Sequence, residues 1–186
     1  YQRVQEISRI VPMVHRPYIN INGKDCINPY NNLSYFEDII SSISDVKTYN
    51  IIHGDCTFSN TLVDDSGNVW LIDPRGTFGS TKIYGDKRYD WAKFYYSASG
   101  NYDSINSKQF KVSVISDYVN LEIKSNGYEV MSDYIISRSG MSKKEMLLIN
   151  ATIWLSLTGY VKEDIDAAMY AFYKGCELWT EAFSQT

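Results

Sequence analysis

The stretch His53–Asp73, HGDCTFSNTLVDDSGNVWLID, decides the fold. It contains two short apolar runs, at 61–63 and 69–72, that have the length of strands. The segment between them, Asp-Asp-Ser-Gly-Asn at 64–68, is typical of a hairpin turn in which the glycine or the asparagine takes a positive φ. The stretch therefore predicts a loop, a strand, a tight turn, a second strand and another loop.

Acidic and amide residues occupy the loop positions around this hairpin. Phosphoryl transfer needs a carboxylate that holds the incoming hydroxyl in line and oxygen ligands that fix magnesium on a triphosphate. A loop of the form His-x-Asp-x-x-x-x-Asn supplies both, and a second aspartate after the hairpin completes the metal site. In this chain the four residues are His53, Asp55, Asn60 and Asp73. As an alternative, loop aspartates and asparagines often serve only as turn formers that bind backbone amides.

The segments HGDCTFSN and LIDPRG together resemble the aminoglycoside phosphotransferase and choline kinase superfamily. The resemblance implies that Asp55 is the catalytic base or hydroxyl-orienting group, and that Asn60 and Asp73 are ligands of Mg²⁺, with ATP as phosphoryl donor. It also implies that His53 braces the loop. Asp90, in the later segment GDKRYDWAKF, is similar to the family residue that ties the catalytic loop together from below.

Two positions depart from that family pattern. Cys56 stands where the family often has an apolar residue, and we interpret it as a small packing residue. A nucleophilic cysteine needs a lowered thiol pKa, and the adjacent carboxylate of Asp55 opposes this. Arg75 follows the expected metal aspartate in Pro74-Arg75-Gly76. Its side chain fits a structural salt bridge as well as it fits contact with a phosphate or substrate.

The remaining sequence predicts an α+β fold that is predominantly helical. The resemblance specifies a protein-kinase-like C-terminal lobe with a small β-hairpin that bears the catalytic and metal loops. We expect a short extended piece at Tyr18–Ile21 and one domain over residues 1–186. Helices are expected at 1–11, from a capping box at Ser34–Glu37 to Ser44, at 109–123, at 146–160 after a capping box at Ser142–Glu145, and from Asp164 to Ala182.

A complete kinase-like enzyme also needs an N-terminal lobe with a Gly-rich strand pair and a strand lysine. The 52 residues before His53 contain no GxGxxG, and Lys24 and Lys47 do not lie on convincing strands. We therefore expect that this chain is the C-terminal lobe, and that an N-terminal nucleotide-binding lobe is its partner in the full-length protein.

Charge and cysteine content limit the other partners. The net charge is −4 and no basic stripe is present, so neither a nucleic acid nor a membrane is expected as a partner. No segment has the unbroken apolar length of a membrane span. The three cysteines are widely spaced and form neither a disulfide framework nor a CxxC metal motif, which favours a reducing compartment such as the cytoplasm.

The predicted function is thus an ATP- and magnesium-dependent phosphotransferase lobe. Its small-molecule substrate is expected to carry a hydroxyl group, as a sugar, an amino alcohol or a carbohydrate precursor does. Two alternatives remain at the sequence level. One is a non-catalytic kinase-like binding module, and the other is a metal-dependent phosphoester hydrolase that uses Asp55, Asp73 and Asp90.

Overall fold

A computed structural model of the protein describes residues 2–44 and 49–184. Contacts between residues divide the chain into two compact units. Unit 1 comprises Tyr1–Asp45, Gln109–Ile123 and Lys143–Thr186, and unit 2 comprises Val46–Lys108 and Lys124–Ser142. Each unit is therefore assembled from segments that are far apart in the sequence, and all the predicted site residues belong to unit 2.

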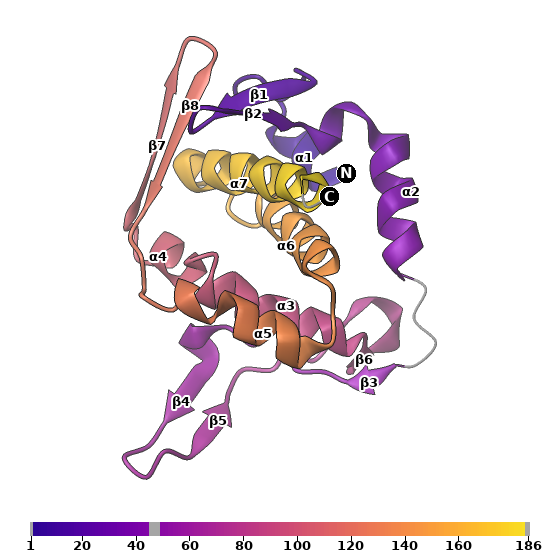
Figure 1. Ribbon diagram of the computed structural model, residues 1–186, viewed down its shortest axis with the longest axis vertical. Helices are drawn as coiled ribbons and strands as arrows, with labels where there is room; N and C mark the ends of the chain where they lie inside the picture. Colours follow the sequence, from indigo (N-terminus) through magenta and orange to yellow (C-terminus); the bar gives the residue numbers. More distant parts are fainter. Residues whose placement is uncertain (1, 45–48, 185–186) are drawn as a thin grey trace. The chain divides into compact units, whose positions relative to one another are not determined.

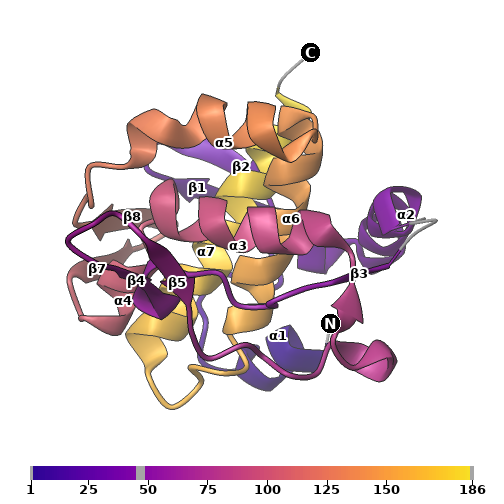
Figure 2. The same ribbon diagram turned by 90° about the horizontal axis from the view of Figure 1, so that it is seen from below.

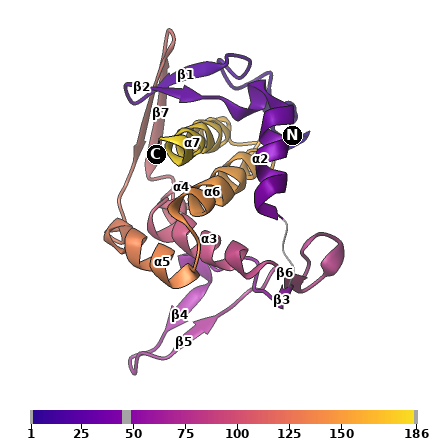
Figure 3. The same cartoon turned by 45° about the vertical axis from the view of Figure 1, so that its right-hand side comes forward.

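Unit 1 contains a four-stranded sheet in the order β2-β1-β8-β7. Two antiparallel hairpins build it, and β1 and β8 join them in parallel. The α-helices among the described residues of this unit are α1, α2, α6 and α7, and Figure 3 shows α6 and α7 side by side, with α7 next to β2. The bounds are Gln2–Ile7 (α1), Tyr18–Ile21 (β1), Lys24–Ile27 (β2), Leu33–Ser44 (α2), Phe110–Ile115 (β7), Tyr118–Ile123 (β8), Lys143–Leu157 (α6) and Ile165–Phe183 (α7).

Helices α6 and α7 form the core of unit 1, because both carry large apolar side chains. Trp154, Trp179 and Phe172 are all fully buried. Both helices were expected from the sequence, and α7 begins where predicted, with the Asp164 carboxylate accepting from the amide of Ala167 at 3.2 Å. Helix α6 is confirmed too, although it begins at Lys143 and ends at Leu157.

The strand expected at Tyr18–Ile21 is confirmed, and its partner β2 adds a hairpin that we did not predict. Asn22 and Gly23 connect the two strands with φ angles of 50° and 81°. Asn-Gly with two positive φ angles is the preferred two-residue hairpin turn. This dipeptide was therefore an available signal for the second strand.

The helix expected at 109–123 is wrong, because this segment is the β7–β8 hairpin. Its apolar residues alternate, with Phe110, Val112 and Val114 on one strand. β-branched residues favour strands, and Ser116 with φ of 57° makes the turn. The apolar residues of this segment also fit a broad helical face, but their period of two is typical of a strand.

Helix α2 is confirmed, but its N-terminal cap differs from the prediction. The amide of Tyr35 donates to the side-chain oxygen of Asn32 at 3.3 Å, so Asn32 takes the capping position expected for Ser34. Helix α1 is also shorter than expected and ends at Ile7.

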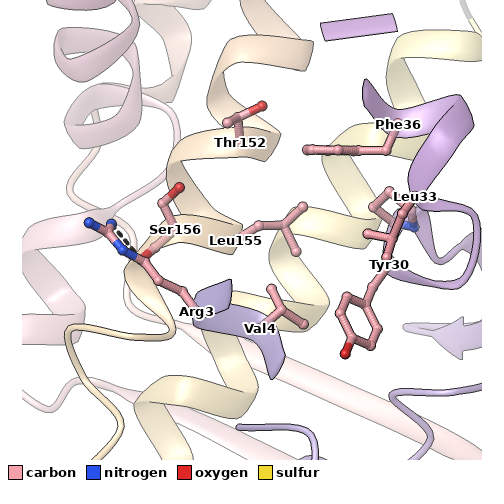
Figure 4. A pocket seen from close by; sticks show the side chains of 9 residues that line it. Arg3, Val4, Tyr30, Leu33, Phe36, Thr152, Leu155 and Ser156 are labelled. Carbon is pink, nitrogen blue, oxygen red and sulfur yellow. Dashed lines mark hydrogen bonds between the residues drawn. The ribbon is translucent and has the colours of Figure 1, made fainter. Parts of the chain in front are cut away.

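Unit 1 holds a pocket of about 270 Å³. Figure 4 shows Val4, Leu155, Tyr30 and Phe36 around it. Arg3 lies at its edge and donates to the carbonyl of Ser156 at 3.1 Å. The lining thus mixes polar and apolar groups, and the positive group beside the pocket is already bound to the protein.

The described residues of unit 2 form short strands, three α-helices and short 3-10 turns (Figure 1). Strand β3 pairs with β6, and β4 pairs with β5, both antiparallel. The predicted hairpin is therefore confirmed, and its turn contains Gly67 with φ of 80°. The bounds are Asn50–Ile51 (β3), Thr61–Val63 (β4), Val69–Leu71 (β5), Tyr84–Gly85 (β6), Lys87–Ala98 (α3), Tyr102–Asn106 (α4) and Ser132–Ser139 (α5).

Helix α3 lies at the centre of unit 2, beside α5, and Figure 2 shows it passing behind the β4–β5 hairpin. Asp86 caps it by accepting from the amide of Arg88 at 2.9 Å. Its buried face carries Ala92, Tyr96 and Ala98. No helix was expected here, although the capping aspartate before a mixed apolar segment indicates one.

The general fold class is confirmed, since the described residues form an α+β fold with many helices and small sheets. None of the described helices combines the length and the apolar character that crossing a membrane requires.

Candidate phosphotransfer site

Asp90 on α3 holds the start of the loop that begins at His53. Its Oδ2 accepts from the amide of His53 at 2.8 Å, and its Oδ1 accepts from the amide of Gly54 at 2.7 Å. Backbone donors away from bulk water need such partners. Both carboxylate oxygens of Asp90 are thus engaged in fixing the loop backbone.

His53 joins the loop to the end of strand β5. Its Nδ1 accepts from the amide of Asp55 at 3.3 Å, and its Nε2 lies 2.9 Å from the carbonyl oxygen of Ile72. Because an amide donates to Nδ1, the ring proton belongs on Nε2, which donates to the carbonyl. Both nitrogens are bound to backbone groups. The imidazole therefore links the loop that begins at His53 to the segment that follows strand β5.

The second half of the loop is anchored by α3 and α4. Ser97 accepts from the amide of Phe58 at 3.1 Å, and Asp103 accepts from the amide of Ser59 at 3.1 Å. Phe58 also packs edge-on against Phe94, with ring centroids 5.4 Å apart. The loop therefore presents a fixed backbone from which Asp55 and Asn60 project.

Asp55 is held on both carboxylate oxygens by side chains. Lys93 places its Nζ 2.8 Å from Oδ1, and Asn60 donates from Nδ2 to Oδ2 at 3.0 Å. The side chain of Asp55 nevertheless remains 39% exposed. A turn-forming aspartate binds backbone amides with its carboxylate, whereas this carboxylate is oriented by side chains and remains open to a ligand.

The amide of Asn60 has a defined orientation. Its Nδ2 donates to Asp55 twice, to the backbone oxygen and to Oδ2, both at 3.0 Å. Because Nδ2 faces Asp55, Oδ1 points away from the Asp55 carboxylate. Among the described residues no group donates to this oxygen, so Asn60 presents a free oxygen ligand.

Asp73 follows the hairpin in a left-handed backbone conformation. Its φ is 55°, a conformation that is uncommon for residues other than glycine but that aspartate adopts more often than most. Two hydrogen bonds bracket it: the amide of Ile72 donates to the carbonyl of Asn60 at 2.9 Å, and the amide of Arg75 donates to the carbonyl of His53 at 2.9 Å. These bonds place the backbones of Asn60 and Asp73 near each other at the end of the hairpin.

The donor set fits a magnesium ion that binds together with a nucleotide. The described residues contain no group of three or more His, Cys, Asp or Glu side chains arranged for a metal. Mg²⁺ commonly takes one or two protein carboxylates and completes its octahedron with water and substrate phosphates. The oxygens of Asn60 and Asp73 match that role, whereas a metal cage made only of protein ligands does not.

Arg75 packs against the loop through its aliphatic portion. A Cβ added at Gly54, whose φ is 81°, would lie 2.9 Å from the Cβ of Arg75. The guanidinium Nη1 donates to the hydroxyl of Tyr89 at 3.4 Å. The close approach explains the glycine after His53, and it places Arg75 next to the loop that begins at His53.

Cys56 is a buried residue of this loop. Burial raises the pKa of its thiol to about 12, with a further contribution from the negative charge of Asp90. Such a thiol stays protonated near neutral pH, which agrees with a packing residue and not with a nucleophile.

Lys93 is the site residue that the sequence analysis missed. It lies three residues after Asp90 in YDWAKF, so the two side chains share one face of α3. Its Nζ lies 4.6 Å from the centroid of the Tyr96 ring and 5.4 Å from that of Tyr102. The spacing to Asp90 was the only available signal, and the pairing with Asp55 depends on the tertiary fold.

The comparison with protein families matches residues 24–96 to Seadornavirus VP7. The matched segment contains the loop from His53 to Asn60, the β4–β5 hairpin and Asp90. No curated protein and no solved structure matches the chain.

The prediction of membership in the aminoglycoside phosphotransferase and choline kinase superfamily is therefore wrong, since the family match points to a viral protein family. The resemblance rested on a few loop residues between 50 and 96. Such residues are chosen by the chemistry of a site, so they are weak evidence of ancestry.

Proposed function

We propose that unit 2 carries the catalytic half of an ATP- and magnesium-dependent phosphotransferase for a small hydroxylated acceptor, with the layout of a kinase-like C-terminal lobe. The observation that supports this proposal best is the environment of the Asp55 carboxylate. Its carboxylate is oriented through both oxygens and is still 39% exposed, as a hydroxyl-orienting group must be.

In the proposed reaction, Asp55 accepts a hydrogen bond from the acceptor hydroxyl and aims its oxygen at the γ-phosphorus of ATP. The acceptor oxygen forms the new bond to phosphorus, and the bond to the bridging oxygen breaks with its electron pair passing to ADP. The hydroxyl proton goes to Asp55 and then to solvent. Bound magnesium would neutralise charge on the phosphates.

Asn60 and Asp73 have the proposed task of holding the metal. The free Oδ1 of Asn60 follows from the double engagement of Nδ2 with Asp55. Orientation of the acceptor and binding of the metal are therefore coupled through one side chain. His53 and Asp90 support both residues by fixing the loop backbone.

The β4–β5 hairpin supports the proposal of a nucleotide and an N-terminal lobe on this side of unit 2. Its apolar side chains are exposed on both faces. A contiguous patch of exposed apolar side chains usually marks a binding site. The exposed apolar residues here are Leu62, Val63, Val69, Trp70, Leu71 and Ile72. We propose that ATP and the nucleotide-binding lobe of the full-length protein cover them.

The test is phosphoryl transfer by the full-length protein from ATP to a panel of sugars and amino alcohols. We expect magnesium-dependent product formation that Asp55→Ala lowers by at least about 100-fold, and that Asp38→Ala, an exposed residue on α2, leaves unchanged. Binding of Mg-ATP without transfer to any acceptor would instead support a binding module. Release of phosphate from a phosphoester without nucleotide would support a hydrolase.

A further inference from the structure

Lys93 is unusually buried for a lysine. Its side chain is 11% exposed, and its ammonium has one carboxylate partner among the described residues, Asp55. Lysine side chains are seldom buried unless they are paired. By contrast, the side chain of Lys174, whose Nζ also lies 2.8 Å from a carboxylate oxygen, is 23% exposed.

The surroundings of Lys93 are aromatic. Tyr96 and Tyr102 stack with centroids 4.4 Å apart, and both rings lie within cation–π distance of Nζ. Burial raises the pKa of both phenols, so the two rings stay neutral. Asp55 is therefore the anion that balances this ammonium.

Helix α3 holds the catalytic loop by two successive contacts. Asp90 fixes the backbone at His53 and Gly54, and Lys93 fixes the side chain of Asp55. Replacing a buried ion pair by apolar residues is often neutral for stability or even stabilising. Stability alone is therefore a weak reason for placing an ammonium here, and a role in the chemistry is the better explanation.

We propose that Lys93 is a positioning residue of the phosphotransfer site. It holds the Asp55 carboxylate in the orientation that receives the acceptor hydroxyl. The proposal rests on the proposed function, and it assigns to α3 the control of the reactive group as well as of the loop backbone.

The experiment compares Lys93→Met and Lys93→Arg with wild type in the full-length protein. Methionine keeps the length and the apolar stem of lysine but removes the charge. We expect Lys93→Met to lower kcat by about 100-fold or more, the effect typical of losing one preorganised charged contact, while the KM for Mg-ATP stays within about threefold. Lys93→Arg should recover at least about tenfold of this loss, because it restores the charge.

The matched control is Lys174→Met, which removes the ammonium of the Lys174–Glu177 pair in unit 1 and should leave kcat unchanged. Thermal unfolding of each variant separates loss of fold from loss of orientation. If Lys93→Met does not accumulate as folded protein, Lys93→Gln takes its place with the same expected loss.

Two results would overturn the inference in distinguishable ways. A folded Lys93→Met or Lys93→Gln protein with a kcat within about threefold of wild type refutes the positioning role and leaves the phosphotransferase function in place. A wild-type protein that transfers phosphate to no acceptor refutes the proposed function, and the role of Lys93 fails with it.

Discussion

At the scale of single residues, the site depends on side chains that are held from several directions. Asp55 contacts Lys93 and Asn60, and the Nδ2 of Asn60 is thereby committed to Asp55. His53 fixes the loop backbone through hydrogen bonds of both ring nitrogens. A substitution at one of these positions is therefore expected to disturb its neighbours, so the effects of combined variants should not be additive.

Gly54 offers a prediction that separates backbone strain from crowding. Gly54 and Gly127 both have positive φ, 81° and 82°, but only at Gly54 does an added Cβ meet a neighbour, the Cβ of Arg75 at 2.9 Å. We expect Gly127→Ala to lower the free energy of unfolding by about 1 kcal/mol, because alanine is strained in the left-handed conformation of Gly127. Gly54→Ala should lower it by at least about 1 kcal/mol more and should also reduce phosphotransfer.

Urea denaturation of the two glycine variants measures this difference. The Gly127→Ala variant controls for the cost of the left-handed backbone. Equal destabilisation of the two variants would show that the Arg75 contact relaxes freely, and that the close packing of the loop does not require glycine.

At the scale of secondary-structure elements, the β4–β5 hairpin stands out because its apolar side chains are exposed on both faces. Trp70 is 51% exposed and lies opposite Leu62 across the two strands. A cross-strand pair contributes only about 0.2–1 kcal/mol to stability. This exposed pair therefore adds little to the stability of unit 2.

We expect Trp70→Ser to lower the free energy of unfolding by less than about 1 kcal/mol. If the nucleotide or the N-terminal lobe covers this face, the same change should raise the KM for Mg-ATP about tenfold or more, since a large apolar side chain contributes about 1.5–3 kcal/mol when buried. Steady-state kinetics checks this. Ile115→Ser, at the exposed end of β7, is the control, and an unchanged KM for Trp70→Ser would argue against coverage of the hairpin.

The elements also show which features of the sequence were informative. The β4–β5 hairpin was predictable because two apolar runs flank a turn of favourable composition. The β7–β8 hairpin was missed because its turn, Ser116-Asp117, lacks glycine and the apolar residues of 109–123 also fit a helical face. Local composition determines turns well, but strand pairing between β1 and β8 joins residues about a hundred positions apart.

The candidate site shows the same division. Asp55, Asn60 and Asp73 could be named from their spacing, because a loop and a tight hairpin link them over a short distance. Lys93 could not, because its role depends on how α3 packs under the loop. The loop residues could therefore be predicted from their spacing in the sequence. The ammonium of Lys93 reaches Asp55 only through the tertiary fold.

At the scale of the whole molecule, binding of metal and nucleotide should be visible as stability, independently of catalysis. A ligand that binds only the folded state stabilises it by about 2.7 kcal/mol at 100 times its Kd. For a protein of this size that corresponds to a rise in Tm of about 5–10 °C. Asp73 supplies the only carboxylate of the proposed metal set among the described residues, so it should carry the metal dependence of this rise.

We therefore expect Mg-ATP to raise the Tm of the full-length protein, and Asp73→Asn to remove most of the part that requires Mg²⁺. Asp65→Asn, in the exposed turn of the same hairpin, is the matched control and should keep the wild-type shift. Differential scanning calorimetry with ATP, with Mg²⁺ and with both ligands separates the contributions. An equal magnesium-dependent shift in the Asp73→Asn and wild-type proteins would show that the metal is held elsewhere, whatever the outcome of the transfer assay.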